Sequence, residues 1–427
     1  MVLIMKEYLP RIVDEILKFK LESKGAVLIQ GPKWCGKSTT AEQIAKKCIY
    51  MQDEKEKENN IYLAKLDTSG FLSGETPLLI DEWQVIPFIW NQVRMEVDKR
   101  DEFGQFILTG SSTPINFDEA TMHSGIGRIT NLVMRPMSLY ESKESNGMVS
   151  LKELFEKGKI NVCKSSKTLS DYAFYTARGG WPKAINQSNE KVALQQAIDY
   201  YDGLVNSDMS RVDGVKKDPE RVKLLMRSYA RNISTQATNA TIKNDMNTND
   251  NNKLDEDTIY SYVNCLKKLF VVEESIAWNP KLRSKTAIRT SNTRYFVDPS
   301  IACAALGIGP KGLIKDIKTF GLLFENLCIR DLRIYADAID GTLKHFRNAK
   351  NLECDAVITL RDGSWGAIEI KLGSQELIDE AAKNLLTLAK DINDDQKPSF
   401  LAIITATSLA YQREDGVFVI PLACLKD

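Results

Sequence analysis

The stretch that decides the fold is residues 25–47, which read GAVLIQGPKWCGKSTTAEQIAKK. The apolar run at 25–30 predicts a buried strand, and residues 38–47 have the pattern of a helix. Between them, residues 31–38 satisfy G-x-x-x-x-G-K-[ST] at every fixed position, in the strand–loop–helix context that the motif requires. Gly31 and Gly36 permit a backbone path that a Cβ would block, so that amide groups can surround phosphate oxygens. The sequence therefore predicts a site for a nucleoside triphosphate.

The residues of this loop have distinct predicted roles. We expect Lys37 to reach the β- and γ-phosphates of ATP and the Ser38 hydroxyl to coordinate Mg²⁺. The residues expected to contact the nucleotide are Gly31, Pro32, Gly36, Lys37, Ser38 and Thr39. Cys35 occupies a variable position of the motif, which favours a packing role over that of a reactive thiol.

A second motif, PLLIDEWQ at residues 77–84, is an apolar strand that ends in two acidic residues. Asp81 is expected to hold Mg²⁺ together with Ser38, and Glu82 is expected to polarise the attacking water. P-loop kinases and small GTPases usually lack a glutamate here, so hydrolysis is favoured over phosphate transfer to a metabolite. The alternative is that the two acidic residues simply end a strand.

Two further segments carry candidate catalytic residues. QFILTGSS at 105–112 predicts a strand whose carboxyl end places Thr109 or Ser111 near the γ-phosphate or the attacking water, although a plain turn would look the same. HSGIGRI at 123–129 places Arg128 in a glycine-flanked loop. Arg128 is a candidate arginine finger, in cis or from a neighbouring subunit, and the alternative is an arginine that ties its loop to the core.

These segments together carry a resemblance. The order of GPKWCGKSTTA, LLIDEWQ, FILTGSS, GRI and MRPMSLYES resembles that of predicted ATPases of the AAA+ superfamily with an uncharacterised C-terminal region. RGGWP (178–182), ARNIST (230–235), YFVDPS (295–300) and GLLFENL (321–327) extend the resemblance over nearly the whole chain. The resemblance implies an ATPase core, a helical connector, a winged-helix-like middle and a restriction-endonuclease-like last domain, without implying a substrate.

The expected fold class is α/β, with a parallel sheet and flanking helices in the P-loop core. The expected division is 1–145 for the AAA+ ATPase domain, 146–204 for a helical connector or lid, 205–300 for the winged-helix-like region and 313–427 for the nuclease-like domain. Residues 53–60, which are highly charged, and residues 243–257, which are rich in Asn and Asp, are predicted loops.

The middle segment contains two basic stretches. Residues 258–270 have a helical pattern and residues 271–274 a strand pattern, which is the order expected of a winged helix. Residues 281–294 hold five basic side chains and no acidic one, and residues 210–231 hold seven basic against three acidic. Such stretches can contact DNA phosphates, or form a solvated face or an interdomain contact.

The last domain contains a second acidic set. Glu325 is expected on an amphipathic helix, Asp355 on a strand, and Glu369 and Lys371 on one face of the next strand. The spacing resembles the PD-(D/E)xK nuclease fold and predicts a second Mg²⁺ site, with Lys371 stabilising the attacking water or the phosphate charge. Cys354 occupies the position of the usual proline. A fold that keeps these residues for binding or regulation, without cleavage, is the alternative.

Composition limits the remaining choices. The chain has 427 residues, with 57 Lys and Arg against 57 Asp and Glu, 2 His and 8 dispersed Cys. These values disfavour a wholly basic nucleic-acid-binding protein and a His-rich zinc enzyme, and they favour free thiols in a reducing, cytoplasmic compartment. No apolar run predicts a membrane helix. We expect ATP hydrolysis that controls the last domain, with an ATP-gated DNA nuclease or a slowly hydrolysing nucleotide-dependent switch as alternatives. The resemblance is compatible with a homo-oligomer and with a monomer.

Overall fold

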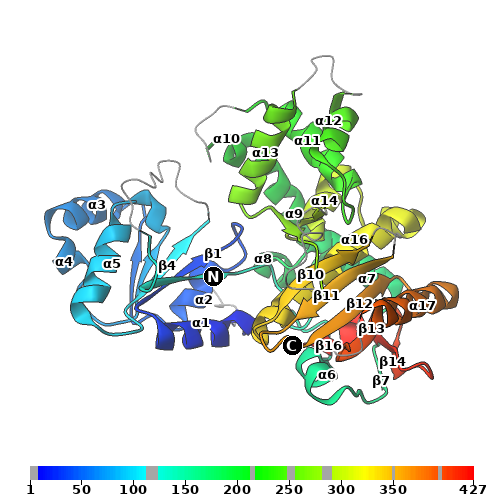
Figure 1. Ribbon diagram of the computed structural model, residues 1–427. Coiled ribbons are helices and arrows are strands. Elements are labelled where there is room, and N and C mark those ends of the chain that lie inside the picture. Colours follow the sequence, from blue (N-terminus) through cyan, green and yellow to red (C-terminus); the bar gives the residue numbers. More distant parts are fainter. Residues whose placement is uncertain are drawn as a thin grey trace.

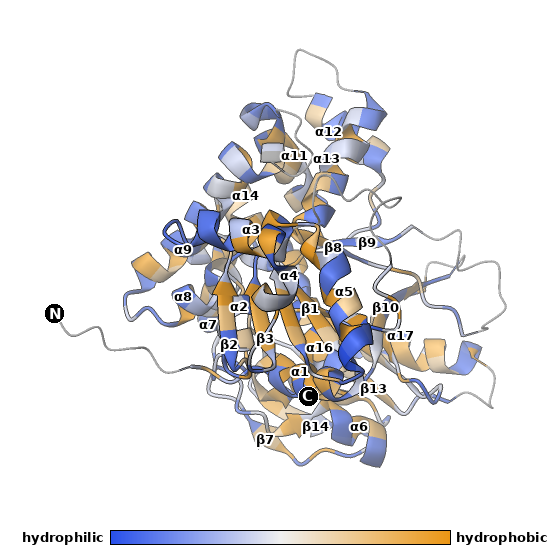
Figure 2. Ribbon diagram, turned by 90° about the vertical axis from the view of Figure 1, so that its left-hand side faces the viewer, coloured by the Kyte–Doolittle hydropathy of each residue, from blue (hydrophilic) through white to orange (hydrophobic). Residues whose placement is uncertain are grey.

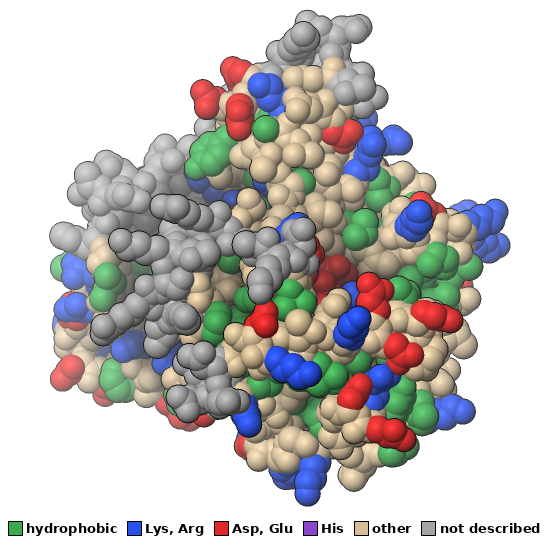
Figure 3. Space-filling view, turned by 45° about the vertical axis from the view of Figure 1, so that its right-hand side comes forward, with side chains coloured by type: hydrophobic (Ala, Val, Ile, Leu, Met, Phe, Trp, Pro, Cys, Tyr) green, Lys and Arg blue, Asp and Glu red, His purple; other side chains and the backbone are tan. Residues whose placement is uncertain are grey.

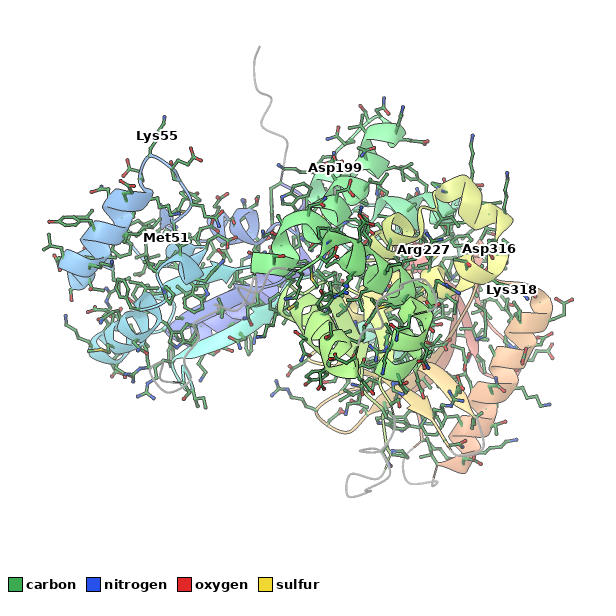
Figure 4. The ribbon with its side chains drawn as sticks, turned by 90° about the horizontal axis from the view of Figure 1, so that it is seen from above. Met51, Lys55, Asp199, Arg227, Asp316 and Lys318 are labelled. Carbon is green, nitrogen blue, oxygen red and sulfur yellow. The ribbon has the colours of Figure 1, made fainter. Side chains whose placement is uncertain are left out.

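The computed structural model describes residues 8–111, 124–211, 217–247, 255–280, 291–348, 352–392 and 397–427. Two units lie side by side (Figure 1): an amino-terminal unit, residues 8–134, and a larger carboxy-terminal body, residues 137–427. Seen from above (Figure 4), Met51 and Lys55 belong to the first unit, and Asp199, Arg227 and Asp316 to the second. Within the described residues, no helix combines the length and apolarity that crossing a membrane would require.

The amino-terminal unit is built on a five-stranded sheet in the order β2-β3-β4-β1-β5, in which every pair of neighbours is parallel. Its strands are β1 (Ala26–Gln30), β2 (Lys47–Tyr50), β3 (Leu78–Asp81), β4 (Phe106–Gly110) and β5 (Ile129–Val133). Its helices are α1 (Ile12–Ser23), α2 (Lys37–Glu42), α3 (Lys57–Leu66), α4 (Thr68–Phe71) and α5 (Ile89–Arg100).

This sheet is apolar on both faces because helices cover both. Val27 and Ile29 of β1 pack with α1 and α2, whereas Ala26 and Leu28 pack with α3, α4 and α5. Continuous apolar strands of this kind are typical of parallel sheets, and Figure 2 shows them in the hydrophobic colour. The carboxyl ends of all five strands meet at one edge, where the motifs at residues 31–38, 81–82 and 109–111 lie together.

The middle of the chain is mostly helical; α9 and α11 to α14 form the upper part of the larger body in Figure 1, and α6 lies at its lower end beside β7. Its helices are α6 (Leu151–Lys157), α7 (Leu169–Arg178), α8 (Pro182–Ile185), α9 (Glu190–Gly203), α10 (Met209–Arg211), α11 (Pro219–Arg231), α12 (Asn239–Asn247), α13 (Glu256–Lys268), α14 (Pro299–Leu306) and α15 (Pro310–Lys315). A π-helical stretch, Leu204–Asp208, joins α9 to α10. After α13, strands β8 (Val272–Ser275) and β9 (Thr293–Phe296) form an antiparallel ladder. Three helices and a ladder are the elements of a winged helix, and that assignment stays a prediction.

The last part of the chain forms a seven-stranded mixed sheet in the order β10-β11-β12-β13-β15-β14-β7. Its elements are α16 (Ile317–Ala338), β10 (Thr342–Arg347), β11 (Glu353–Thr359), β12 (Trp365–Lys371), α17 (Gln375–Asp391), β13 (Phe400–Thr405), β14 (Leu409–Gln412) and β15 (Phe418–Pro421). Helix α16 packs on one face, against Ile368 and Ile370, and α17 packs on the other, against Ala367.

The divisions expected within residues 146–427 do not each correspond to a separate hydrophobic core. The edge strand β7 (Cys163–Lys164) pairs with β14, and β6 (Val149–Ser150) pairs with β16 (Leu425–Lys426), so residues assigned to the connector complete the last sheet. One apolar cluster runs from Leu139 to Leu425 through the middle helices and α16. The chain after residue 137 therefore packs as one body.

Two loop predictions were wrong in part. Residues 57–60 begin α3 and residues 243–247 end α12, while residues 248–254 lie outside the described residues. Both segments carry many charged or Asn and Asp side chains, yet each helix buries an apolar residue, Ala64 in α3 and Met246 in α12, against the body. Tertiary packing of a few apolar side chains outweighed the local composition.

Several side chains of the basic stretches are buried or paired in the described part of the chain. Arg294 is buried and bonds to Ala237 and Asn239, and Lys217 is buried over the ring of Tyr262. Lys223 and Arg231 are paired with acidic side chains, Glu220 and Asp245. Residues 281–290, which carry most of the other stretch, lie outside the described residues.

Candidate functional site

The loop between β1 and α2 has the backbone that its glycines were expected to permit. Gly36, at the start of α2, has φ +102°, a conformation that residues with a Cβ rarely adopt. A Cβ on Gly31 would lie 2.1 Å from the carbonyl oxygen of Met134, so only glycine fits there. Lys37 is buried and its Nζ donates to the carbonyls of Gly31, at 3.1 Å, and Pro32, at 2.8 Å. The ammonium group is thus held inside the loop that it would share with phosphate.

The structure brings Asp81 together with two hydroxyl groups. Asp81 ends β3, and its Oδ1 accepts hydrogen bonds from Ser38 Oγ at 2.5 Å and from Thr109 Oγ1 at 2.6 Å. Thr109 lies on β4, is fully buried, and also accepts from the backbone amide of Glu82 at 3.1 Å. A hydroxyl and a carboxylate oxygen at the edge of a phosphate loop are hard donors that suit Mg²⁺. The residues present therefore fit the metal expected from the sequence.

Glu82 follows in a left-handed backbone conformation, φ 55° and ψ 50°, which is uncommon for a residue with a side chain. Its Oε2 accepts from Ser111 Oγ at 3.2 Å and from Gln84 Nε2. The carboxylate is therefore directed towards the end of β4 and fixed by two donors. Ser111, one of the two alternatives at the end of that strand, contacts Glu82, and the other, Thr109, contacts Asp81.

A cavity of about 200 Å³ lies beside the phosphate loop. It is bordered by the first turn of α2, by the segment before α1 and by α8. The lining residues are Tyr8, Leu9, Arg11, Gly36, Thr39, Thr40, Met137, Pro182, Lys183 and Asn186. Gly36 and Thr39 are the members of the predicted nucleotide-contact set that line this cavity. The space beside the phosphate loop is therefore bounded by residues of both units.

The structure places Arg128 away from this edge of the sheet. The Arg128 carbonyl accepts from the amide of Ala26 at the start of β1, whereas the phosphate loop follows the opposite end of that strand. Its guanidinium pairs with Asp98 of α5 at 2.7 Å, and the side chain of Arg128 is 43% exposed. An arginine finger acting in cis is therefore wrong. The remaining interpretations are a tie between loop and helix, and an arginine presented to a second subunit.

The second acidic set is brought together where β11 and β12 separate. The ladder between these strands extends as far as Ala356 and Ile368, and beyond it the carboxylate of Asp355 accepts the amide hydrogen of Ile370 at 2.7 Å. Lys371 Nζ lies 2.7 Å from Glu369 Oε2 and 3.7 Å from Asp355 Oδ2. The Asp355 carboxylate therefore accepts a hydrogen bond that a backbone carbonyl would accept in a continued ladder, and it shares the Lys371 ammonium group with Glu369.

Electrostatics link the fourth member, Glu325 of α16, to the other three. The Tyr295 hydroxyl donates to Glu325 Oε1 at 2.7 Å, and burial and the charge of Asp355 raise the pKa of Glu325 well above its usual range. Burial and Asp355 also raise the pKa of Glu369 to about 8. Burial lowers the pKa of Lys371, but Asp355 and Glu369 outweigh it and the net pKa is raised. The site is thus a set of coupled carboxyl groups around one ammonium group.

A cavity of about 220 Å³ opens on this set, between the β8–β9 ladder, α16 and the sheet, and it includes Glu325 and Asp355. Figure 3, turned towards this side, shows acidic side chains within a hollow between the upper helices and the sheet below them. His345 also lines the cavity. Its Nδ1 lies 2.9 Å from the Ser275 carbonyl, so Nδ1 carries the proton, and Nε2 has no partner among the described residues.

The second Mg²⁺ site expected from the sequence is not formed by these side chains as they lie. Among the residues that the structure describes, no three His, Cys, Asp or Glu side chains are arranged to hold a metal ion. The physical reason is visible in the contacts: Lys371 already pairs with Asp355 and Glu369, and Tyr295 donates a hydrogen bond to Glu325. No metal-dependent step is derived for this site.

Sequence reasoning missed Arg11, which connects the phosphate loop to the larger body. Arg11 is buried, and it donates to the carbonyls of Cys35, at 2.9 Å, and Arg135, at 2.8 Å, and to Glu141 at 3.0 Å. His345 is the second such residue, since no metal-ligand spacing surrounds it in the sequence. Neither residue carries a local signal, because each acquires its partners from segments distant in the chain.

Comparison with known families assigns the amino-terminal unit. Residues 23–143 match the family described as AAA domain. Residues 169–312 and 320–425 match two families described as domains of unknown function, DUF8612 and DUF4143. No protein of curated function matches the chain. The amino-terminal unit is therefore a P-loop ATPase domain of the AAA type, and neither of the other two descriptions names a winged helix or a nuclease.

Three solved structures match most of the chain, at low sequence identity and with TM-scores below 0.5. A Walker-type ATPase of Pyrococcus abyssi has 14% identity and a TM-score of 0.43, over 70% of this chain and 97% of that one. The ORC2 protein of Aeropyrum pernix, in ADPNP–ADP complexes, has 11% identity and a TM-score of 0.31, over 72% and 92%. The ORC1 protein of the same organism, in complex with DNA, has 12% identity and a TM-score of 0.22, over 70% and 94%.

Proposed function

We propose that this protein hydrolyses ATP in the presence of Mg²⁺ at the edge of the amino-terminal sheet, and that the nucleotide state controls the carboxy-terminal body. The observation that carries the proposal is the hydrogen-bonded group of Ser38, Asp81 and Thr109, with Glu82 fixed beside it. These side chains come from α2, β3 and β4 and converge only in the fold. The bound Mg²⁺ would be held by Ser38 and Asp81, and it would neutralise phosphate charge.

The chain's own residues then have separate tasks. Lys37 would leave the loop carbonyls and donate to the β- and γ-phosphates. Thr109 holds Asp81 and the amide of Glu82, so it fixes both carboxylates with one hydroxyl. Glu82, oriented by Ser111, would orient and polarise the attacking water. The adenosine part would occupy the cavity that begins at Thr39.

A continuous set of hydrogen bonds supports the control of the larger body. Arg330 of α16 is buried and pairs with Asp298 at 2.8 Å and Asp331 at 2.7 Å. Asp331 accepts from the amide of Leu139, and Asp298 accepts from that of Gly180, each at 2.9 Å. Three of the segments that carry the family resemblance, at residues 134–142, 178–182 and 295–300, therefore meet at one buried arginine.

This buried group has two neighbours of functional interest. On one side, Arg11 donates both to the carbonyl of Cys35 in the phosphate loop and to Glu141. Glu141 in turn accepts from the amide of Ser138, the neighbour of Leu139 in the chain. On the other side, α16 carries Glu325 as well as Arg330. A displacement of α16 driven from the phosphate loop would therefore change the position of Glu325 relative to Asp355. This is the physical route by which nucleotide could affect the acidic site.

Steady-state hydrolysis of MgATP by the full chain tests the proposal. We expect turnover by the wild type, loss of turnover in Lys37→Ala, and retained ATP binding without turnover in Glu82→Gln. Asp98→Asn, at the opposite end of the sheet, is the matched carboxylate control and should keep wild-type turnover. Turnover that survives Glu82→Gln would contradict the role of Glu82. Tight ATP binding with very slow wild-type turnover would replace hydrolysis by the nucleotide-dependent switch.

A second candidate function, an ATP-gated DNA nuclease, rests on one observation. Glu325, Asp355, Glu369 and Lys371 resemble the PD-(D/E)xK set. Glu325 and Asp355 line a cavity, and Lys371 lies beside Asp355 and Glu369. Nicking of plasmid DNA in buffer containing ATP and MgCl₂ tests it, with Asp355→Asn as the variant and Asp379→Asn on the exposed start of α17 as the control. Equal nicking by wild type and Asp355→Asn would assign the cleavage to a contaminant.

The MgATP turnover assay also addresses DNA as a partner. Turnover measured with and without double-stranded DNA should rise with DNA if nucleic acid regulates the ATPase. Turnover that is indifferent to DNA would direct the search for a regulator towards proteins, because the basic side chains of the described middle segment are mostly buried or paired.

A further inference from the structure

The tip of the phosphate loop is held by the helical segment that follows α9. Lys33 Nζ lies 2.6 Å from Asp208 Oδ1, and the two residues are 175 positions apart in the chain. Asp208 is the last residue of the π-helical stretch Leu204–Asp208, and its side chain is 11% exposed. This ion pair is a direct connection between a loop that binds phosphate and a helix of the larger body.

Lys33 is the third residue of the motif at residues 31–38, so its backbone is part of the loop expected to enclose the phosphates. Both ammonium groups of that loop are engaged within the protein: Lys37 with the carbonyls of Gly31 and Pro32, and Lys33 with Asp208. A triphosphate brings several negative charges to this loop. Each lysine would therefore meet a stronger anion than its present partner.

The two lysines differ in what their release leaves behind. The carbonyls that Lys37 leaves are neutral. The carboxylate that Lys33 leaves is mostly buried, and a buried carboxylate without a partner is unfavourable. Asp208 therefore competes with phosphate for Lys33, and this competition lowers the affinity only for a nucleotide whose phosphate reaches Lys33.

Aromatic contacts tie the same loop to the same helix. The ring of Trp34, next to Lys33, lies 6.0 Å from that of Tyr200 on α9, and Tyr200 stacks on Trp181 at 4.4 Å and 29°. A change of partner by Lys33 would be transmitted to α9 through these rings as well as through Asp208. The π-helical stretch between α9 and α10 is a wide turn of the kind that often occurs at functional positions.

We propose that Lys33 is a positioning residue that exchanges Asp208 for the terminal phosphate of ATP, so that Lys33 favours ATP over ADP and Asp208 limits that preference. The proposal rests on the proposed function, in that residues 31–38 must bind the nucleotide. It adds a residue pair that the motif does not specify, and it makes the segment from α9 to α10 the part of the larger body that responds to the γ-phosphate.

Equilibrium dissociation constants for ATP and ADP test the proposal. They would be measured in the full chain, with the Glu82→Gln substitution present throughout so that ATP is not consumed. Relative to that background, Lys33→Met should weaken ATP binding by about tenfold, the worth of one charge-assisted hydrogen bond, and leave ADP binding within about threefold. Asp208→Asn should strengthen ATP binding by about tenfold by removing the competitor. In the double variant the gain from Asp208→Asn should disappear.

Two controls separate positioning from structural damage. Lys33→Arg keeps the charge and should retain most of the preference for ATP, and Asp98→Asn removes a carboxylate from a distant ion pair and should change neither constant. A ratio of the ATP and ADP constants that is the same in all the Lys33 and Asp208 variants overturns this inference. Absence of binding of either nucleotide to the wild-type protein and the Glu82→Gln background overturns the proposed function instead.

Discussion

Replacing Thr109 by valine removes one hydroxyl group while nearly preserving the shape of a fully buried side chain. That hydroxyl donates to Asp81 at 2.6 Å and accepts from the amide of Glu82 at 3.1 Å. In Thr109→Val, Asp81 keeps Ser38 as its other partner at 2.5 Å, and the Glu82 amide loses its acceptor. Both carboxylates proposed for catalysis therefore lose the same support.

The size of the effect follows from these two bonds. A hydrogen bond to a carboxylate contributes about 1.5–3 kcal/mol, and an amide left without an acceptor costs about 1–3 kcal/mol. If about 2–4 kcal/mol of this loss falls on the transition state, turnover decreases by about thirtyfold to a thousandfold. Thr109→Ser keeps the hydroxyl and should remain within about threefold of the wild type.

Steady-state MgATP turnover of the wild type, Thr109→Val and Thr109→Ser is the assay, with the thermal unfolding midpoint of each protein as the control for folding. Turnover by a folded Thr109→Val within about twofold of the wild type would refute the reasoning, because Asp81 and Glu82 would then be oriented without Thr109. Equal losses in Thr109→Val and Thr109→Ser would also refute it, because the serine retains the bonding group.

Three further outcomes can be checked. Arg128→Ala should leave turnover of the monomer within about twofold of the wild type, since this arginine lies at the far end of the sheet; a large loss confined to an oligomer would assign it to a neighbouring subunit. Arg330→Met should lower the free energy of unfolding in urea by about 3–5 kcal/mol, because two buried carboxylates lose their cation, whereas Arg413→Met, in more exposed pairs, should cost less than about 1 kcal/mol. Burial and a neighbouring carboxylate raise the pKa of Glu369 from 4.5 to about 8, so the folded state keeps a proton that the unfolded state has lost. Stability should therefore fall as pH rises from 4.5 to about 8, by at most about 1.4 kcal/mol per pH unit, and Glu369→Gln should make this dependence shallower. An unchanged slope in Glu369→Gln would contradict the raised pKa.

The expectations that held are those written in short, local patterns. The parallel sheet with flanking helices follows from apolar runs separated by helical patterns, and the AAA-type match over residues 23–143 agrees with the ATPase assignment. Asp81 and Thr109 were each expected at the carboxyl end of a strand, and the pairing of β3 with β4 in the structure brings them into contact. Arg128 failed as a cis finger because a glycine-flanked loop gives no information on which end of the sheet it will occupy.

Composition was less reliable than periodicity. The charged residues 57–60 and the Asn-rich residues 243–247 are helical, because Ala64 and Met246 find apolar surfaces that no local count can show. The second Mg²⁺ site was read from a spacing that the fold does reproduce. The spacing did not predict that Lys371 would pair with the carboxylates of Asp355 and Glu369. Among the described residues, no three His, Cys, Asp or Glu side chains are then arranged to hold a metal ion.

The sequence by itself determined the phosphate loop and the strand and helix on either side of it, because a loop of eight residues between a strand and a helix depends on local backbone freedom at Gly31 and Gly36. Only the tertiary structure decided the contacts that join the two units. Lys33 with Asp208, and Arg11 with Glu141, connect residues more than a hundred positions apart. Such pairs leave no periodic signal, since each partner is chosen by the packing of a helix or strand that was already formed for other reasons.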